Sequence, residues 1–157
     1  MRSLTGAALY PGIGLLETTN VSVGRGTDTP FEMMGAPWID AQRLAAYLNA
    51  RKIDGARFVP LKFTPRASVF ANEECGGVNI IITNRAAFRP IAAGFEIAAA
   101  LRLLYPQEWK ADGYARLLAN QETLNLIKSG AAPGEIARTW QAALSKFREA
   151  RAKALLY

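Results

Sequence analysis

The first half of the chain contains several short apolar segments. In some of them apolar and polar residues alternate, and in others the apolar residues are consecutive. Residues 78–83 form a β-branched run after two glycines, which is the pattern of a strand. Residues 57–64 alternate weakly and contain Pro60, which cannot donate a hydrogen bond to a neighbouring strand, so we predict an edge strand there. Residues 13–16 and 21–23 are shorter apolar runs that we also predict to be extended. These segments together predict a small sheet.

Helical spacing of apolar side chains dominates the rest of the sequence. Asp40 is a suitable N-cap for a helix over residues 41–51, and residues 91–105 are apolar on most faces, which predicts a buried helix. One or two short helices are expected to end at Gly130, and the last helix is expected to begin at Pro133. The apolar stripe of that last helix consists of Ile136, Trp140, Leu144 and Phe147.

The order of these elements contains no repeated strand–helix–strand unit. We therefore predict the α+β class, with a small mixed sheet packed against several helices in a single domain over residues 1–157. Half of the 157 residues are hydrophobic and a fifth are charged, which fits one globular domain with a sizeable core. No apolar run is long enough to span a membrane, and the first residues do not resemble a signal peptide.

The counts of cysteine and histidine exclude several kinds of site. Cys75 is the only cysteine, so no disulfide can form within the chain, and we expect it to be a small buried residue. The absence of histidine removes Ser-His-Asp and Cys-His nucleophilic sites and most zinc sites. We expect no metal and no cofactor, so any chemistry has to use carboxylates, Arg, Lys, Tyr or hydroxyl groups.

The formal charge of +6 favours an anionic partner such as nucleic acid, acidic lipid or an anionic glycan. A solvated helix face explains the loose basic cluster near the C-terminus better than a nucleic-acid footprint, because no signature of a nucleic-acid module accompanies it. We therefore expect no nucleic-acid partner, and steeply salt-dependent DNA binding would contradict this. The cluster consists of Arg138, Lys146, Arg148, Arg151 and Lys153.

A segment over residues 10–38 combines glycine, proline, charged and hydroxyl residues too irregularly for one helix or strand. Such a segment is typical of a loop that presents polar groups from a rigid scaffold, and residues 24–38 are predicted as this loop. Its motifs are Tyr10-Pro-Gly, Leu16-Glu17, Asn20-Val-Ser22, Gly24-Arg-Gly-Thr27, Pro30-Phe-Glu32 and Gly35-Ala-Pro-Trp38. Further motifs are Phe63-Thr-Pro65, Cys75-Gly-Gly77 and the closing Leu155-Leu-Tyr157.

Together these motifs resemble the C-terminal half of the exo-β-N-acetylmuramidase (NamZ-type) family. The resemblance implies removal of terminal N-acetylmuramic acid from peptidoglycan fragments, in a cleft between this domain and a Rossmann-like N-terminal domain. It also implies that a Pro-Glu-His-Gly motif of the N-terminal domain carries the catalytic acid. This sequence lacks that motif, so we expect the C-terminal domain alone, catalytically incomplete when isolated. The alternative is a non-catalytic module for muropeptide binding or assembly. The family implies a periplasmic or secreted location, without a visible signal peptide here.

Under this resemblance, the loop offers candidates for a second carboxylate, because glycosidic cleavage commonly uses two carboxyl groups about 5–10 Å apart. The candidates are Glu17, Asp28 and Glu32. The alternative interpretation is that Asp28 or Glu32 pairs with Arg25 and holds the loop in place.

The resemblance also implies substrate-binding residues. Arg25 can bind the lactyl carboxylate of muramic acid with its planar guanidinium, or it ties the loop to its own domain. Asn20 and Thr27 can hydrogen-bond a sugar, or they cap turns. Trp38 can stack on a sugar ring, or it fills the core.

Overall fold

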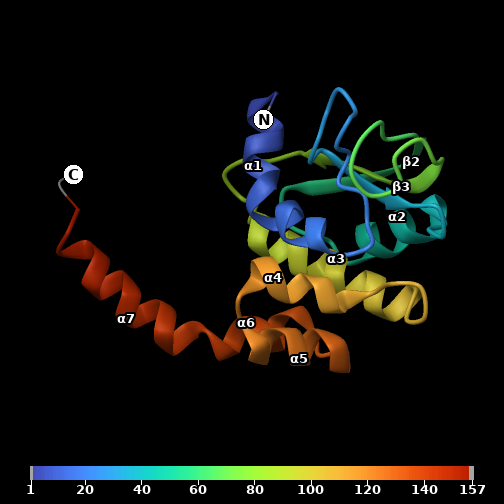
Figure 1. Cartoon of the computed structure of the whole chain (residues 1–157). Coiled ribbons are helices and arrows are strands. Elements are labelled where there is room, and N and C mark those ends of the chain that lie inside the picture. The colour runs from blue at the N-terminus through green and yellow to red at the C-terminus, as the bar shows by residue number, and fades with distance from the viewer. Residues whose placement is uncertain (1, 156–157) are drawn as a thin grey trace.

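The computed structural model describes residues 2–155 (Figure 1). Its elements in chain order are α1 (Leu4–Ile13), the 3₁₀ helix η1 (Gly14–Thr18), β1 (Met33–Ala36), α2 (Ala41–Ala50), β2 (Ala56–Phe63), β3 (Cys75–Ile82), α3 (Pro90–Leu104), the 3₁₀ helix η2 (Ala111–Tyr114), α4 (Ala115–Leu118), α5 (Gln121–Ser129), α6 (Pro133–Thr139) and α7 (Gln141–Ala152). Within the described residues no helix is both long and apolar enough to cross a membrane.

The predicted α+β class is confirmed, although the sheet is antiparallel at both pairings and contains no parallel pair among the described strands. The strand order is β1-β3-β2, so β2 is the edge strand that Pro60 predicted. Phe58, Val78 and Ile80 lie on the sheet face that packs against α2, and all three are buried. Val59 and Ile81 point to the opposite face, where each is 40% exposed.

Helix α3 forms the centre of the helical layer and contacts both α1 and α2. It begins at Pro90 and buries an almost continuous apolar surface, as predicted. It crosses α1 at Gly12 and Gly94, where a Cβ built on Gly94 would lie 2.9 Å from the Cα of Gly12. The two backbones therefore approach each other more closely than any larger residue would allow.

Helix α2 confirms the sequence prediction in detail. The side chain of Asp40 accepts a hydrogen bond of 3.0 Å from the backbone N–H of Arg43, as an N-cap residue does. The short helices also end as predicted, because Gly130 closes α5 with a φ of +82°.

Two local predictions are wrong, and a third is confirmed only in part. Residues 13–16 are not extended, because Leu9, Ile13 and Leu16 are buried at helical spacing along α1 and η1. Part of the predicted loop over residues 24–38 is strand β1, which forms because β3 offers it a partner. Residues 21–23 contribute only one bridge, between Ser22 and Gly35.

The last predicted helix is two helices. Trp140 separates α6 from α7 and remains attached to the body of the molecule, where its indole N–H donates a hydrogen bond of 2.9 Å to the hydroxyl of Thr123. Helix α7 then extends away from the other elements (Figure 1) and buries no residue. Phe147, which was predicted to continue the apolar stripe, is 62% exposed.

Candidate functional site

Two loops meet at one end of the molecule: residues 19–32 precede β1, and residues 64–74 connect β2 to β3 (Figure 1). Gly26, with a φ of +80°, lies against the second loop, where a Cβ would be 2.5 Å from the backbone nitrogen of Ala67. Only glycine allows this approach at this backbone conformation. The Gly24-Arg-Gly-Thr27 motif therefore allows the first loop to pack against the second.

Both loops contain unusual backbone conformations. Of the six non-glycine residues with positive φ among those described, four lie in these loops: Phe31, Ser68, Phe70 and Asn72. Such conformations cost on the order of 1–3 kcal/mol each and persist only where the surrounding structure holds them, often at binding sites. The backbone conformation of these loops therefore lowers the stability of the fold. For this reason we considered whether the side chains of the loops bind a ligand.

Glu17 and Arg25 form the most developed charged pair in this region. The Nη2 of Arg25 donates to the Oε2 of Glu17 at 3.0 Å, and its Nε donates to Oε1. The hydrogen bonds to Glu17 raise the pKa of Arg25. The side chain of Arg25 is 46% exposed and that of Glu17 is 20% exposed, so the pair faces solvent. Among the described residues, the Nη1 of Arg25 has no hydrogen-bond acceptor.

Two aromatic residues support this pair and were not singled out as site residues by sequence reasoning. The guanidinium carbon of Arg25 lies 5.0 Å from the centre of the Phe31 ring, a cation–π contact. The ring of Tyr10 meets the same Phe31 ring edge to face, at 4.9 Å between centres. Tyr10 precedes Glu17 by about two helical turns, so a shared helix face was a signal that could have identified it.

The other two candidate carboxylates have different partners, and neither pairs with Arg25. Asp28 is exposed and lies 3.6 Å from the guanidinium of Arg2. Glu32 accepts a hydrogen bond from the hydroxyl of Ser3, which is also the N-cap of α1. Glu32 therefore ties the loop to the start of α1, while Asp28 lies at the surface.

The remaining predicted binding residues make contacts within the domain. The side-chain amide of Asn20 donates to the carbonyl of Glu108 at 2.8 Å and accepts from the N–H of Lys110 at 2.7 Å. The hydroxyl of Thr27 donates to the carbonyl of Gly24 at 2.6 Å, which closes a turn.

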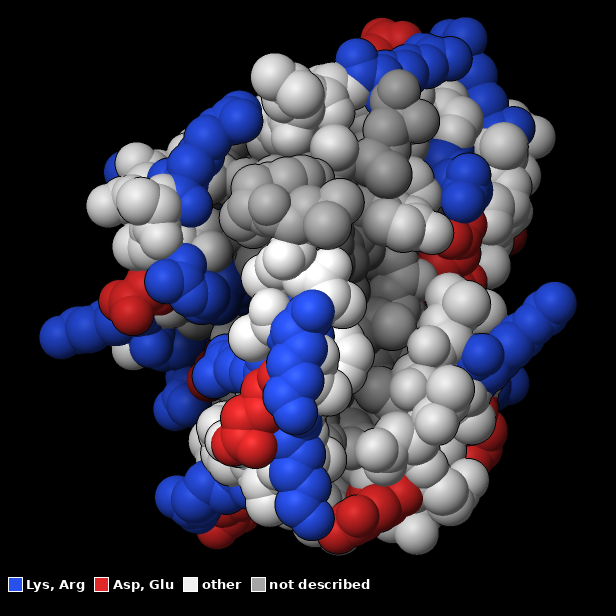
Figure 2. Space-filling view, turned by 90° about the vertical axis from the view of Figure 1, so that its left-hand side faces the viewer, with Lys and Arg blue, Asp and Glu red and all other residues white. Residues whose placement is uncertain are grey.

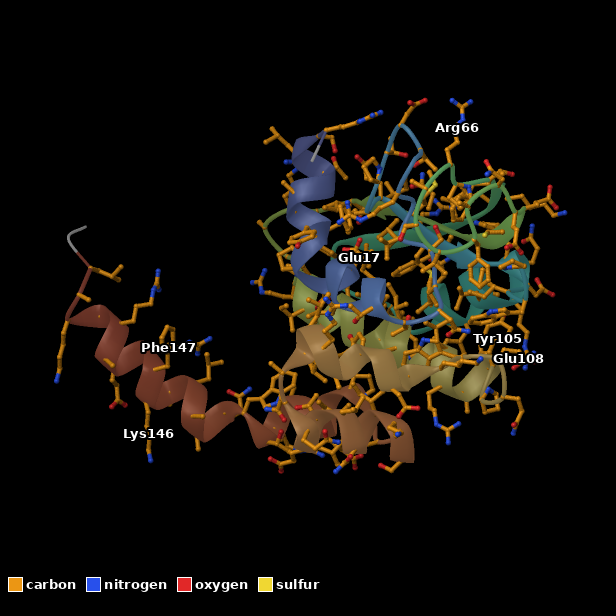
Figure 3. All side chains as sticks on the ribbon, in the orientation of Figure 1. Glu17, Arg66, Tyr105, Glu108, Lys146 and Phe147 are labelled. Carbon is orange, nitrogen blue, oxygen red and sulfur yellow. The ribbon has the colours of Figure 1, made fainter. Side chains whose placement is uncertain are left out.

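Trp38 lies away from the Glu17–Arg25 pair. It is half-buried against the ring of Tyr105, at 5.4 Å between ring centres. Tyr105 and Glu17 are well separated in Figure 3. The structure therefore brings together Glu17 and Arg25 from the predicted set and leaves Trp38 elsewhere.

An open concavity of about 750 Å³ borders Glu17. It is lined by Glu17, Thr18, Asp112, Gly113, Ala115 and Arg116. The buried side-chain polar atoms that have no partner among the described residues all lie where residues 17–20 pack against residues 108–114: the Thr18 hydroxyl, the Trp109 indole N–H and the Tyr114 hydroxyl. Burial raises the pKa of Tyr114, so its hydroxyl stays protonated. Such groups are typically satisfied by internal water.

One face of the molecule carries charges of both signs. Figure 2, seen from the side toward which α7 extends, shows Lys and Arg side chains interspersed with Asp and Glu.

Cys75 is buried, as expected, and burial raises its pKa to about 11. Within residues 2–155, no group of three or more His, Cys, Asp or Glu side chains is arranged to hold a metal ion.

Comparison with known proteins finds one family model. Residues 8–157 match the model described as the C-terminal part of exo-β-N-acetylmuramidase NamZ. The chain is also 31% identical over 160 residues to the peptidoglycan β-N-acetylmuramidase NamZ of Bacillus subtilis (strain 168), and the match covers the whole chain and 39% of that protein.

Two solved structures have the same fold. Both are DUF1343 family proteins from Bacteroides fragilis NCTC 9343. The first has a TM-score of 0.72 and 27% identity, and the match covers 96% of this chain and 42% of that chain. The second has a TM-score of 0.70 and 23% identity, with coverage of 99% and 41%. The chain therefore spans about two fifths of the length of these relatives.

Proposed function

Because the chain belongs to the family of NamZ C-terminal domains, we propose that it forms one wall of a cleft that binds the terminal N-acetylmuramic acid of peptidoglycan fragments. The opposite wall would come from a Rossmann-like N-terminal domain of the kind expected from the sequence resemblance. The B. subtilis relative is named a peptidoglycan β-N-acetylmuramidase, and this chain matches only 39% of it. We therefore assign substrate binding to this chain and the complete reaction to the two domains together.

The observation that carries this proposal is the solvent-facing pair of Glu17, in η1, and Arg25, in the loop over residues 19–32. N-acetylmuramic acid differs from N-acetylglucosamine by a lactyl group, which carries a carboxylate. A guanidinium that is already oriented by Glu17 and by the ring of Phe31 loses little freedom when it binds this anion. The Nη1 of Arg25 offers the donor for that contact.

Glu17 is the carboxylate that we propose for an auxiliary role. It is held in place by Arg25 and borders the open concavity, so one face of the carboxylate can accept a hydrogen bond from a sugar hydroxyl. Asp28 and Glu32 are less suited, because Asp28 is fully exposed and Glu32 is engaged with Ser3. Since cleavage commonly needs two carboxyl groups that flank the bond, Glu17 would act with a group from the other domain.

Titration of the isolated chain with the disaccharide β-N-acetylmuramyl-(1→4)-N-acetylglucosamine tests this proposal. Heat and chemical shifts would report binding, and released sugar would report turnover. We expect saturable binding without turnover. N,N′-diacetylchitobiose (chitobiose below), which lacks the lactyl carboxylate, should bind at least about tenfold more weakly, since a hydrogen bond to a charged group contributes about 1.5–3 kcal/mol, or about 10- to 150-fold in affinity.

Arg25→Gln should remove this preference for the carboxylate. Arg57→Gln, a change of the same type at an exposed position on β2, is the matched control and should bind as the unmodified chain does. Unchanged binding in Arg25→Gln would contradict the proposed role of Arg25. Sugar release by the isolated chain would contradict the proposal that a second domain completes the reaction.

A further inference from the structure

Tyr10 presents an aromatic ring to solvent beside Arg25. The side chain is 42% exposed, although α1 buries its neighbour Leu9 almost completely. Tyr10 and Arg25 both contact the ring of Phe31, which places the phenol and the guanidinium in the same region. The apolar ring and the charged pair thus share one exposed surface.

The orientation of this ring is fixed by the protein. A Cβ built on Gly14 would lie 3.0 Å from the Cε2 of Tyr10, so the ring packs closely over Gly14. On another side, the ring meets Phe31 at an interplanar angle of 88°. An aromatic side chain that is held in this way has little conformational entropy to lose when a ligand packs against it.

Phe31 contacts both Tyr10 and Arg25. Its ring centre is 4.9 Å from that of Tyr10 and 5.0 Å from the guanidinium carbon of Arg25. Phe31 has a φ of +70°, an unfavourable conformation for a bulky residue. This conformation places the ring of Phe31 in contact with both Tyr10 and Arg25. A single substituted monosaccharide could therefore contact both of these side chains.

We propose that Tyr10 is the aromatic platform on which the ring of a bound saccharide stacks while Arg25 binds its carboxylate. This inference rests on the proposed function and adds a second, apolar element to the same site. A pyranose has a face of C–H groups that packs favourably against an exposed aromatic ring. The sequence suggested Trp38 for this role, but Trp38 lies against Tyr105 and away from Arg25.

The two elements make different predictions for two ligands. A stacking platform contributes to the binding of any β-linked saccharide, whereas Arg25 contributes only where a carboxylate is present. Tyr10→Ala should therefore weaken binding of both the muramyl disaccharide and chitobiose about five- to tenfold. Tyr10→Phe should bind both as the unmodified chain does, because the stacking face is retained. Phe147→Ala, which removes an exposed aromatic ring from α7, is the matched control and should change neither affinity.

Proton NMR of the bound saccharide provides a readout that a merely structural role would not move. Protons on the stacked face of the sugar should shift upfield in the ring current of Tyr10. This shift should persist when the saccharide is bound to Tyr10→Phe, and to Arg25→Gln at a saturating concentration of saccharide. It should disappear in Tyr10→Ala. Thermal unfolding of each variant would verify that the domain remains folded.

One result would contradict this inference and leave the proposed function intact. In that result the unmodified chain binds and Arg25→Gln loses the carboxylate preference, but Tyr10→Ala binds both saccharides normally. The inference also fails if the sugar protons of the bound ligand show no upfield shift. If the unmodified chain binds neither saccharide, the proposed function fails and this inference fails with it.

Discussion

Replacement of Gly12 by alanine tests how closely α1 is held against α3. A Cβ at this position would lie 1.9 Å from the carbonyl oxygen of Pro90 and 3.3 Å from the backbone nitrogen of Gly94. Both atoms belong to the backbone, so relief requires the two helices to separate by about an ångström in a close-packed interior. Overpacking of this kind costs about 1–3 kcal/mol, and more where backbone must move. The greater helix propensity of alanine offsets about 1 kcal/mol of that cost.

Because backbone atoms must move, we take the upper end of this range, and after the offset we expect Gly12→Ala to reduce the free energy of unfolding by about 2 kcal/mol. Urea unfolding followed by tryptophan fluorescence measures this, provided that the slope of the transition is unchanged. Gly134→Ala is the matched control, because a Cβ there has no neighbour within 4 Å, and it should be neutral or stabilising by up to about 1 kcal/mol. A loss below about 0.5 kcal/mol in Gly12→Ala would refute the close helix contact.

The remaining predictions concern individual side chains. Glu17→Gln should lower the free energy of unfolding by less than about 1 kcal/mol, since its pair with Arg25 faces solvent, and urea unfolding would measure this. Cys75 should react slowly with a thiol reagent at pH 8 until urea unfolds the chain, because burial raises its pKa from 9.0 to about 11. Since the unfolded thiol ionises first, this residue's contribution to stability should decline as the pH rises from 9.0 to about 11, relative to Cys75→Ala. Phe147→Ala should change stability by less than about 0.5 kcal/mol, whereas Leu101→Ala in the core should cost about 2–5 kcal/mol.

The sequence predicts elements well where the signal is local. Helix α2 has an N-cap and a regular stripe, and β3 has a β-branched run, so both were located to within a few residues. Strand β1 could not be found in this way, because Met33–Ala36 is short, contains glycine and becomes a strand only by pairing with β3. The end of α1 and the start of η1 were missed at residues 13–16, where a short apolar run fits either periodicity.

The ion pair of Arg25 was not predicted correctly from the sequence. Sequence reasoning identified Glu17 and Arg25 but expected Asp28 or Glu32 to be the structural partner of Arg25. The seven residues between Glu17 and Arg25 include a turn whose path depends on contacts with residues 64–74, which no local pattern encodes. The sequence did not suggest the proposed role of Tyr10, because Tyr10 and Arg25 are brought together by Phe31, whose backbone has a positive φ.

Helix α7 has a consequence for the cooperativity of the fold. No residue of its twelve is buried, and a helix of this length is marginally stable in water without tertiary support. Its amide hydrogens should exchange with solvent through local opening, many orders of magnitude faster than those of α3, whose exchange requires the core to unfold. The cooperative unit of this domain therefore ends near Trp140, at its hydrogen bond to Thr123. Helix α7 beyond it can unfold and refold locally, and its helix content does not report on the stability of the core.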